Sequence, residues 1–161
     1  MSKLTIAQNI ATIGPLGYFP KAPGTIGSLP GLAFGAVLGK LYSINMLSAV
    51  SVILILVNIF LVAWWAIEET ENLWATHDDK RIVVDEFVGM SIVVSFGSFI
   101  WWQYLVAFAL FRFFDIRKPW LVGYFDREVP SSLGTLMDDV VAGLMSFACF
   151  GIINSILLFI L

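Results

Sequence analysis

Cysteine and histidine are almost absent from this chain of 161 residues, which has one of each, Cys149 and His77. A single cysteine excludes an internal disulfide, and neither residue type is numerous enough to build a cysteine- or histidine-rich metal centre. We interpret Cys149 as a small apolar residue and His77 as a polar loop residue. We therefore expect any metal site to be made from oxygen ligands, with a ligand role for His77 as the alternative.

Charged residues are also scarce. They make up 13% of the chain, against roughly 25% in soluble domains, whereas 59% of the residues are hydrophobic. The mean hydropathy is +0.89. This composition predicts a membrane protein, treated as one domain over residues 1–161. The net charge of −3 gives no indication of a nucleic-acid partner, and the N-terminal segment is not typical of a cleavable signal.

Four apolar segments organise the chain. Residues 44–67 and 140–161 carry no charge and are long enough to cross a bilayer, which takes about 20 residues. Residues 26–39 are about half a membrane thick. Residues 87–111 could cross once or fold into two short legs, because Phe96-Gly97-Ser98 interrupts them. The long apolar runs predict an all-α fold: a polytopic membrane bundle with short or re-entrant helices beside full spans.

The basic residues favour one topology. If residues 26–39 and 87–111 both fold so that the polar segments share one face, the opposite face holds only Lys40. The positive-inside rule then makes the shared face cytoplasmic. That face carries the remaining basic residues: Lys3, Lys21, Lys80, Arg81, Arg112, Arg117, Lys118 and Arg127.

Two acidic pairs, Asp85-Glu86 and Asp138-Asp139, stand where apolar segments begin, and a glycine follows four residues after Asp85 and after Asp139. Acids at helix N-termini are favoured by the helix dipole, which is one explanation. Two such pairs at membrane helices are costly unless a cation joins them. Hard divalent cations take carboxylate oxygens, so the pairs indicate a Mg²⁺ site.

A charged stripe follows the third apolar segment. Arg112, Asp115 and Lys118 recur at three-residue spacing among aromatic residues, so they fall along one side of a helix. The stripe is either a surface salt-bridge ladder or the wall of a polar cavity that holds an anionic phosphate. Asp126-Arg127, in the next connection, adds a further charge pair.

A glycine-rich stretch, residues 22–30, precedes the first of these groups. Backbone N–H groups and the hydroxyls of Thr25 and Ser28 could bind an anion where this stretch enters a helix. The phosphate-loop spacing with its lysine is absent, so the pattern is a weak signal by itself.

Four motifs in order make the chain similar to the phosphatidylglycerophosphatase A family. They are PGTIGSL (residues 23–29), VDEFVGM (84–90), FRFFDIRKPW (111–120) and FDREVPSSLGTLMDDVVAG (125–143). The resemblance implies a Mg²⁺-dependent phosphatase of the bacterial inner membrane that converts phosphatidylglycerophosphate into phosphatidylglycerol, with its active site facing the cytoplasm. Ser131-Ser132 departs from the family pattern, which often has glycines there.

The resemblance and the residue patterns together suggest roles. Metal ligands or water-orienting groups are expected at the two acidic pairs: Asp85, Glu86, Asp138 and Asp139. Phosphate-holding cations are expected at Arg112, Lys118 and Arg127. Asp115 and Asp126 would orient those cations, hold metal or act as a base. Attack by water is the default route, with an aspartyl-phosphate on Asp115 as the alternative.

Other chemistries lack their residues. A cysteine phosphatase would need its thiol beside an anion-binding loop, and a histidine-based lipid phosphatase usually needs two histidines. No two aspartates are separated by a single residue, as the Asp-x-Asp phosphatases require, and the DGxxAR signature of phospholipid-forming transferases is absent. The alternative from another class is a membrane cation transporter that uses the same acids as an ion path. No pattern in the sequence indicates an oligomeric state.

Overall fold

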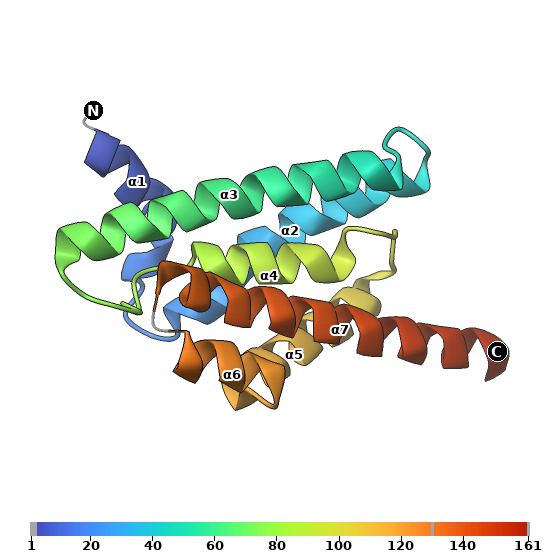
Figure 1. Cartoon of the computed structure of the whole chain (residues 1–161). Helices are drawn as coiled ribbons and strands as arrows, with labels where there is room; N and C mark the ends of the chain where they lie inside the picture. Colours follow the sequence, from blue (N-terminus) through green and yellow to red (C-terminus); the bar gives the residue numbers. More distant parts are fainter. Residues whose placement is uncertain (1–2, 130, 161) are drawn as a thin grey trace.

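A computed structural model describes residues 3–129 and 131–160, and within these ranges every regular element is helical (Figure 1). The predicted all-α fold is confirmed. The helices are α1 (Lys3–Ala11), α2 (Pro23–Ser43), α3 (Ala49–Trp74), α4 (Val84–Val94), α5 (Trp101–Arg117), α6 (Leu121–Glu128) and α7 (Ser132–Ile160), with a short 3₁₀ turn, η1 (Leu16–Tyr18), after α1.

The short helix α4 is the centre of the bundle, and α2, α3, α5 and α7 all pack against it. One apolar cluster, which includes Met90, Phe111 and Phe150, joins α4 to α5 and α7. A second, which includes Ile67 and Val88, joins α4 to α1 and α3. Because α4 is enclosed on these sides, polar side chains in its first turn are also enclosed.

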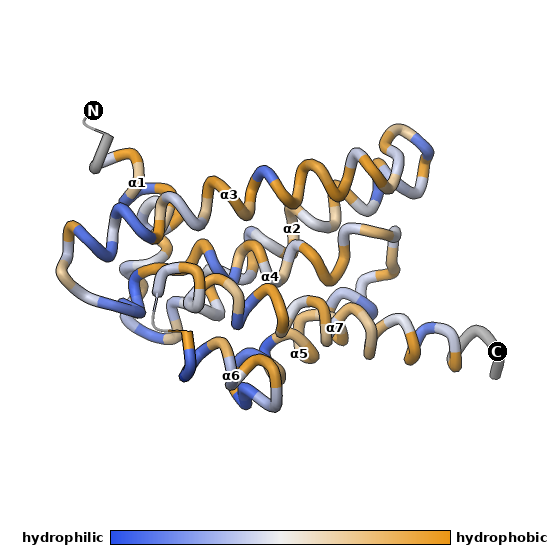
Figure 2. The backbone as a smooth tube through the Cα atoms, viewed as in Figure 1, coloured by the Kyte–Doolittle hydropathy of each residue, from blue (hydrophilic) through white to orange (hydrophobic). Residues whose placement is uncertain are grey.

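The polar connections lie together at one end of the bundle. Figure 2 shows hydrophilic segments gathered where α3 ends and where α4 and α7 begin, whereas the long middle stretches of α3 and α7 are hydrophobic. All twelve carboxylates of the sequence fall between residues 68 and 139. The chain thus has one charged end and a long apolar body.

Two helices of the described chain are long and apolar enough to cross a membrane: Ala49–Trp74 and, within α7, Ser132–Ile156. Both differ in extent from the expected spans. The first starts after the expected residue 44, because residues 44–48 form a loop and the Ser48 hydroxyl caps the helix by accepting from the Ser51 N–H at 3.1 Å. The second starts before residue 140, capped by the Ser131 hydroxyl, which accepts from the Gly134 N–H at 3.3 Å.

The two ambiguous segments have different outcomes. Residues 87–111 form two short legs, α4 and α5, joined by residues 95–100, which is one of the two arrangements expected from the sequence. Residues 26–39, expected to be about half a membrane thick, lie within the 21-residue helix α2, which is not one of the two described helices that are long and apolar enough to cross a membrane. Pro23 starts this helix at its first turn, where a proline has no hydrogen bond to lose, and the helix continues through Pro30.

Glycines let the helices approach α4 closely. A line of them along α2 faces α4, and a Cβ added at any of these positions would collide with α4 or with the residues beside its ends: Gly27, Gly31, Gly35 and Gly39. On the opposite side of α4, a Cβ at Gly89 would lie 2.5 Å from the carbonyl oxygen of Asp139. Small residues allow this kind of tight crossing in membrane bundles. The crossing brings the first turn of α4 against the start of α7.

Replacing Gly143 by alanine should separate α4 from α7. Its Cβ would overlap the backbone of Gly89, and overpacking of this kind costs about 1–3 kcal/mol. We expect a lower melting temperature in detergent and a loss of whatever activity depends on the two helix starts meeting. Gly151→Ala is the matched control on the same helix, because nothing lies within 4 Å of its added Cβ. Equal behaviour of the two variants would contradict the close crossing.

Candidate functional site

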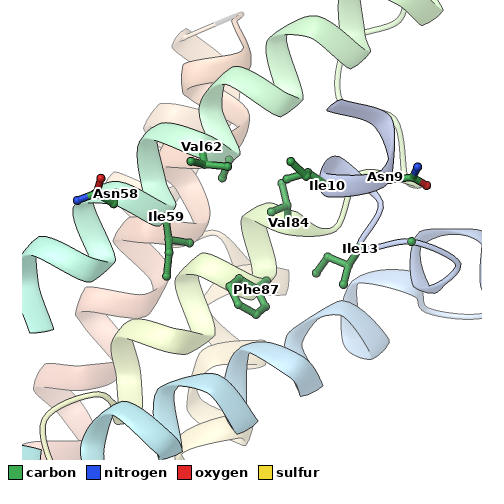
Figure 3. Close-up of a pocket in the computed structure, with 10 residues that line it drawn as sticks. Asn9, Ile10, Ile13, Asn58, Ile59, Val62, Val84 and Phe87 are labelled. Carbon is green, nitrogen blue, oxygen red and sulfur yellow. The ribbon is translucent and has the colours of Figure 1, made fainter. Parts of the chain in front are cut away.

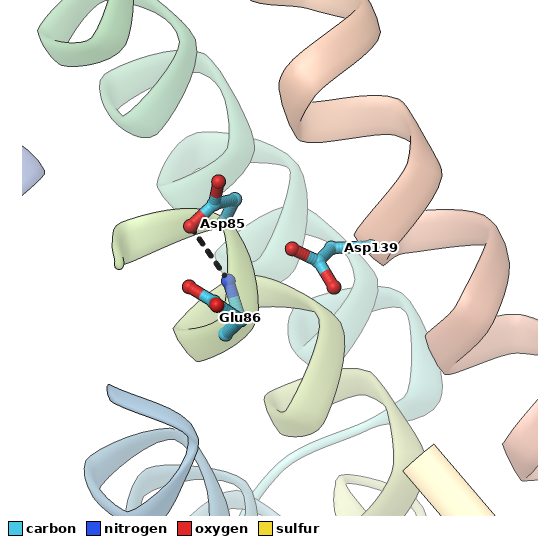
Figure 4. A group of neighbouring side chains, drawn as sticks. All are labelled: Asp85, Glu86 and Asp139. Carbon is cyan, nitrogen blue, oxygen red and sulfur yellow. Dashed lines mark hydrogen bonds between the residues drawn. The ribbon is translucent and has the colours of Figure 1, made fainter. Parts of the chain in front are cut away.

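Three carboxylates from α4 and α7 converge at the charged end of the bundle (Figure 4). Oxygens of Asp85, Glu86 and Asp139 all lie within 4.8 Å of one another. Asp85 and Asp139 are buried, and the Glu86 backbone N–H donates to Asp85 Oδ1 at 3.0 Å. Burial, followed by the adjacent Glu86 carboxylate, raises the pKa of Asp85 well above its ordinary range. The cluster therefore stores like-charge repulsion that a cation would relieve.

Two oxygens of this cluster have no hydrogen-bond partner among the described residues, although both are buried: Glu86 Oε2 and Asp139 Oδ1. Buried carboxylate oxygens are normally hydrogen-bonded or bound to a metal. An all-oxygen donor set suits a hard divalent cation such as Mg²⁺ and does not suit zinc. The residues present thus fit the ion that the sequence suggests.

Arg112 lies beside the acidic cluster. Its Nη1 pairs with Asp115 and donates a hydrogen bond to Ser28 Oγ at 3.4 Å. The same atom lies 3.9 Å from Glu86 Oε1. The guanidinium is mostly buried, and its Nε has no partner among the described residues. A fixed guanidinium with an unused N–H is suited to an additional anion.

Lys118 is the second cation. Its Nζ pairs with Asp126 and, at 2.8 Å, with Asp138 Oδ2. Burial lowers its pKa, but the hydrogen bonds to Asp126 and Asp138 outweigh burial, so the net effect raises the pKa above its ordinary value. Lys118 therefore remains charged at neutral pH. For the acid Asp115, burial has the opposite effect and raises the pKa, although the charges of Arg112 and Lys118 oppose this.

These groups surround one cavity of about 260 Å³, which we call the acidic cavity. Seven of the predicted site residues line it: Asp85, Glu86, Arg112, Asp115, Lys118, Asp138 and Asp139. The charged stripe is therefore a cavity wall and not a surface ladder. Residues 78–80 and Thr135 also line the cavity, and the sequence analysis did not single them out. The charged HDDKR run at 77–81, four residues before the first acidic pair, is the signal that could have found residues 78–80.

Four predicted site residues lie elsewhere. Asp126 lies behind Lys118 and lines a small side chamber of about 80 Å³. Arg127 donates from Nε to the Gly123 carbonyl at 3.0 Å, within its own helix. Ser28 is buried and donates to the Gly24 carbonyl at 2.7 Å, so its hydroxyl supports Arg112 from behind. Thr25 is half-buried and is not part of the cavity lining.

A separate cavity of about 460 Å³ lies between α1, α3 and α4 (Figure 3). Ile10, Ile59 and Phe87 are among its lining residues, and Asn9 and Asn58 are its polar side chains. It contains no titratable group. The predicted charged residues therefore line the acidic cavity and not this one.

Comparison with known proteins adds independent information. The family model described as "Phosphatidylglycerophosphatase A" matches residues 9–154. A phosphatidylglycerophosphatase A from Haemophilus influenzae is 38% identical over 129 residues, covering 80% of this chain and 76% of the relative. The Escherichia coli protein of the same name is 35% identical over 131 residues, covering 81% of this chain and 73% of its own.

A third relative carries a different name. A Bacteroides thetaiotaomicron protein, provisionally named a phosphatidylinositol-3-phosphatase, is 37% identical over 134 residues, covering 81% of this chain and 82% of its own. No solved structure gives a significant match. The three names share removal of a phosphate from a phospholipid headgroup.

Proposed function

The chain belongs to the phosphatidylglycerophosphatase A family, and on this premise we propose that it hydrolyses phosphatidylglycerophosphate to phosphatidylglycerol and phosphate with the help of Mg²⁺. The observation that carries the proposal is the acidic cavity, in which three converging carboxylates face Arg112 and Lys118. Such an arrangement offers a cation site beside two fixed positive charges. Hydrolysis of a phosphate monoester requires positive charge from both sources, because the phosphate oxygens are anionic and catalysis consists mainly of positioning and electrostatic stabilisation.

Asp85, Glu86 and Asp139 are the proposed holders of Mg²⁺. Their oxygens lie together, whereas Asp138, which the sequence analysis included in the same set, directs Oδ2 to Lys118. Bound there, the ion supplies positive charge that stabilises the phosphate oxygens and orients water. Asp138 is better suited to positioning Lys118.

The remaining groups bind and orient the phosphate. Arg112 and Lys118 would donate hydrogen bonds to its oxygens, with Asp115 and Asp126 fixing the direction of the two cations. The oxygen of an attacking water forms the new bond to phosphorus while the bond to the lipid glycerol oxygen breaks. Asp115 is the proposed acceptor of the water proton, because burial raises its pKa and makes it a better base.

We place the protein in the bacterial inner membrane as a polytopic bundle, with the charged end at the cytoplasmic face and the acyl chains of the substrate left in the bilayer. The uneven distribution of basic residues supports this. It can be checked with single cysteines introduced after Cys149→Ala. Thr76→Cys and Leu121→Cys should react with an impermeant maleimide only from the cytoplasmic side, and Met46→Cys only from the other. Labelling of positions 76 and 121 from opposite sides would refute the arrangement.

The function itself is tested with purified protein and phosphatidylglycerophosphate in mixed micelles. Phosphate should be released when Mg²⁺ is present, and chelation by EDTA should abolish the release until Mg²⁺ is restored. A cation transporter, the alternative from the sequence, would move ions across proteoliposomes without producing phosphate. No release from the lipid at saturating Mg²⁺ would refute the proposal. Phosphatidylinositol 3-phosphate in a parallel assay measures which headgroup is preferred.

A further inference from the structure

His77 occupies a position that the proposed reaction has not used. It lies in the loop between α3 and α4, on the boundary between two cavities. One is an outer polar cavity of about 510 Å³, and the other is the side chamber of about 80 Å³. The chamber shares three wall residues with the acidic cavity: Asp78, Thr135 and Asp138. The imidazole is therefore half-exposed, and it lines a chamber that borders the acidic cavity.

Glu71 fixes the orientation of this ring. Glu71 Oε1 lies 3.1 Å from His77 Nδ1 and also accepts from the Asp78 N–H at 2.9 Å and from Thr135 Oγ1 at 3.4 Å. Because a carboxylate can only accept, Nδ1 must carry the hydrogen of the first bond. Nε2 is then the ring nitrogen left for other chemistry. The same three bonds fasten the loop to α3 and to the first turn of α7.

The proposed reaction needs a proton donor for the glycerol oxygen, which is the leaving group. When the P–O bond to the lipid glycerol breaks, its electron pair stays on the glycerol oxygen, and an alkoxide is a poor leaving group without a proton. Lys118 is unsuited to supply it, because its hydrogen bonds raise its pKa, and Arg112 does not deprotonate in proteins. His77 carries the one imidazole of the sequence, and imidazole is the side-chain group that most often transfers protons in catalysis.

We propose that His77, oriented by Glu71, donates a proton from Nε2 to the glycerol oxygen as it leaves. The inference rests on the proposed hydrolysis of an alkyl phosphate. The water oxygen bonds to phosphorus and gives its proton to Asp115, the lipid alcohol leaves with the proton of His77, and the half-exposed ring regains a proton from solvent. The charged groups that line the two cavities beside the ring are Glu68, Glu71, Asp78, Asp126 and Asp138, and Lys118 pairs with the last two.

The test compares two leaving groups. The leaving group of phosphatidylglycerophosphate is an alkoxide. The leaving group of p-nitrophenyl phosphate is a stabilised phenolate that needs no proton. His77→Ala should lower kcat on the lipid about 100-fold to 1,000-fold, the range of general acid catalysis, and should change the aryl phosphate rate far less. Added imidazole should restore part of the lipid activity.

His77→Asn separates chemistry from structure. Its amide can replace Nδ1 as the donor to Glu71, so it keeps the loop in place, but it provides no acid. We expect it to be as impaired on the lipid as His77→Ala, with an unchanged melting temperature. Glu68→Gln, in the same outer cavity, should leave both rates unchanged. Near-normal lipid turnover by His77→Asn, or equal losses on both substrates without imidazole rescue, would overturn the role of His77.

Failure of the proposed function gives a different pattern. A wild-type protein that hydrolyses phosphatidic acid but not phosphatidylglycerophosphate would overturn the proposed lipid substrate. The role of His77 would then be decided by the same comparison, with phosphatidic acid as the alkyl ester.

Discussion

Replacing Asp139 by asparagine should abolish phosphate release and, in the absence of metal, make the protein more stable. Asp139 contributes one of three converging carboxylates, and its buried Oδ1 has no partner among the described residues. An amide removes one negative charge and provides an N–H that the neighbouring carboxylates can accept. We expect activity to fall about 10³-fold, as when a central electrostatic group is removed. The unfolding free energy should rise by about 1–2 kcal/mol, as is common where function requires a strained site.

Asp138→Asn is the matched control, since it removes the same charge one residue earlier. It breaks the pair with Lys118, so it should reduce activity and lower the melting temperature. Mg²⁺ should raise the melting temperature of the wild type and of Asp138→Asn but not of Asp139→Asn. If Asp139→Asn were stabilised by Mg²⁺ as strongly as the wild type, the assignment of Asp139 as a ligand would be refuted.

Arg112→Lys should be nearly as inactive as Arg112→Ala, with kcat/KM reduced about 100-fold or more relative to the wild type, the size of loss seen when one electrostatic donor is removed. Arg112 pairs with Asp115, contacts Ser28 and still has an unused Nε. A lysine has the charge but not the planar fork needed to make these contacts together with a phosphate.

Arg117→Ala is the control for this prediction, because Arg117 has the same charge five residues later but is exposed. It should keep nearly full activity. Steady-state kinetics on micellar substrate distinguish the variants. An Arg112→Lys protein with wild-type kcat/KM would show that only charge is required there, and the proposed hydrogen bonds from the Arg112 guanidinium to the phosphate would be wrong.

The sequence predicted which residue types form the site better than it predicted where their side chains point. Asp138 and Asp139 were treated as equivalent, yet neighbouring residues on a helix point about 100° apart. Asp139 consequently joins the α4 acids, whereas Asp138 pairs with Lys118. Ser28 was expected to face an anion but supports Arg112 from behind. Such distinctions depend on helix rotation, which packing partners set and a short motif does not specify.

Long-range contacts account for the other differences. The sequence offered no reason for the glycines that follow the two acidic pairs, and in the structure they mark the place where α4 and α7 cross. The loop of residues 75–83 closes one side of the cavity, and no role was assigned to its acidic residues from the sequence. His77 belongs to that loop, and it was interpreted only as a polar loop residue because a single histidine forms no recognisable motif.

The proposed function depends on Asp85, Glu86 and Asp139 holding a divalent cation beside Arg112 and Lys118. Mn²⁺ takes the carboxylate ligands that suit Mg²⁺ and scatters anomalously, so a crystal of the protein soaked in Mn²⁺ would locate it directly. We predict an anomalous peak among the oxygens of these three residues, and its disappearance in crystals of Asp139→Asn. A peak at another position, or none at saturating Mn²⁺, would contradict a cation site formed by these three carboxylates.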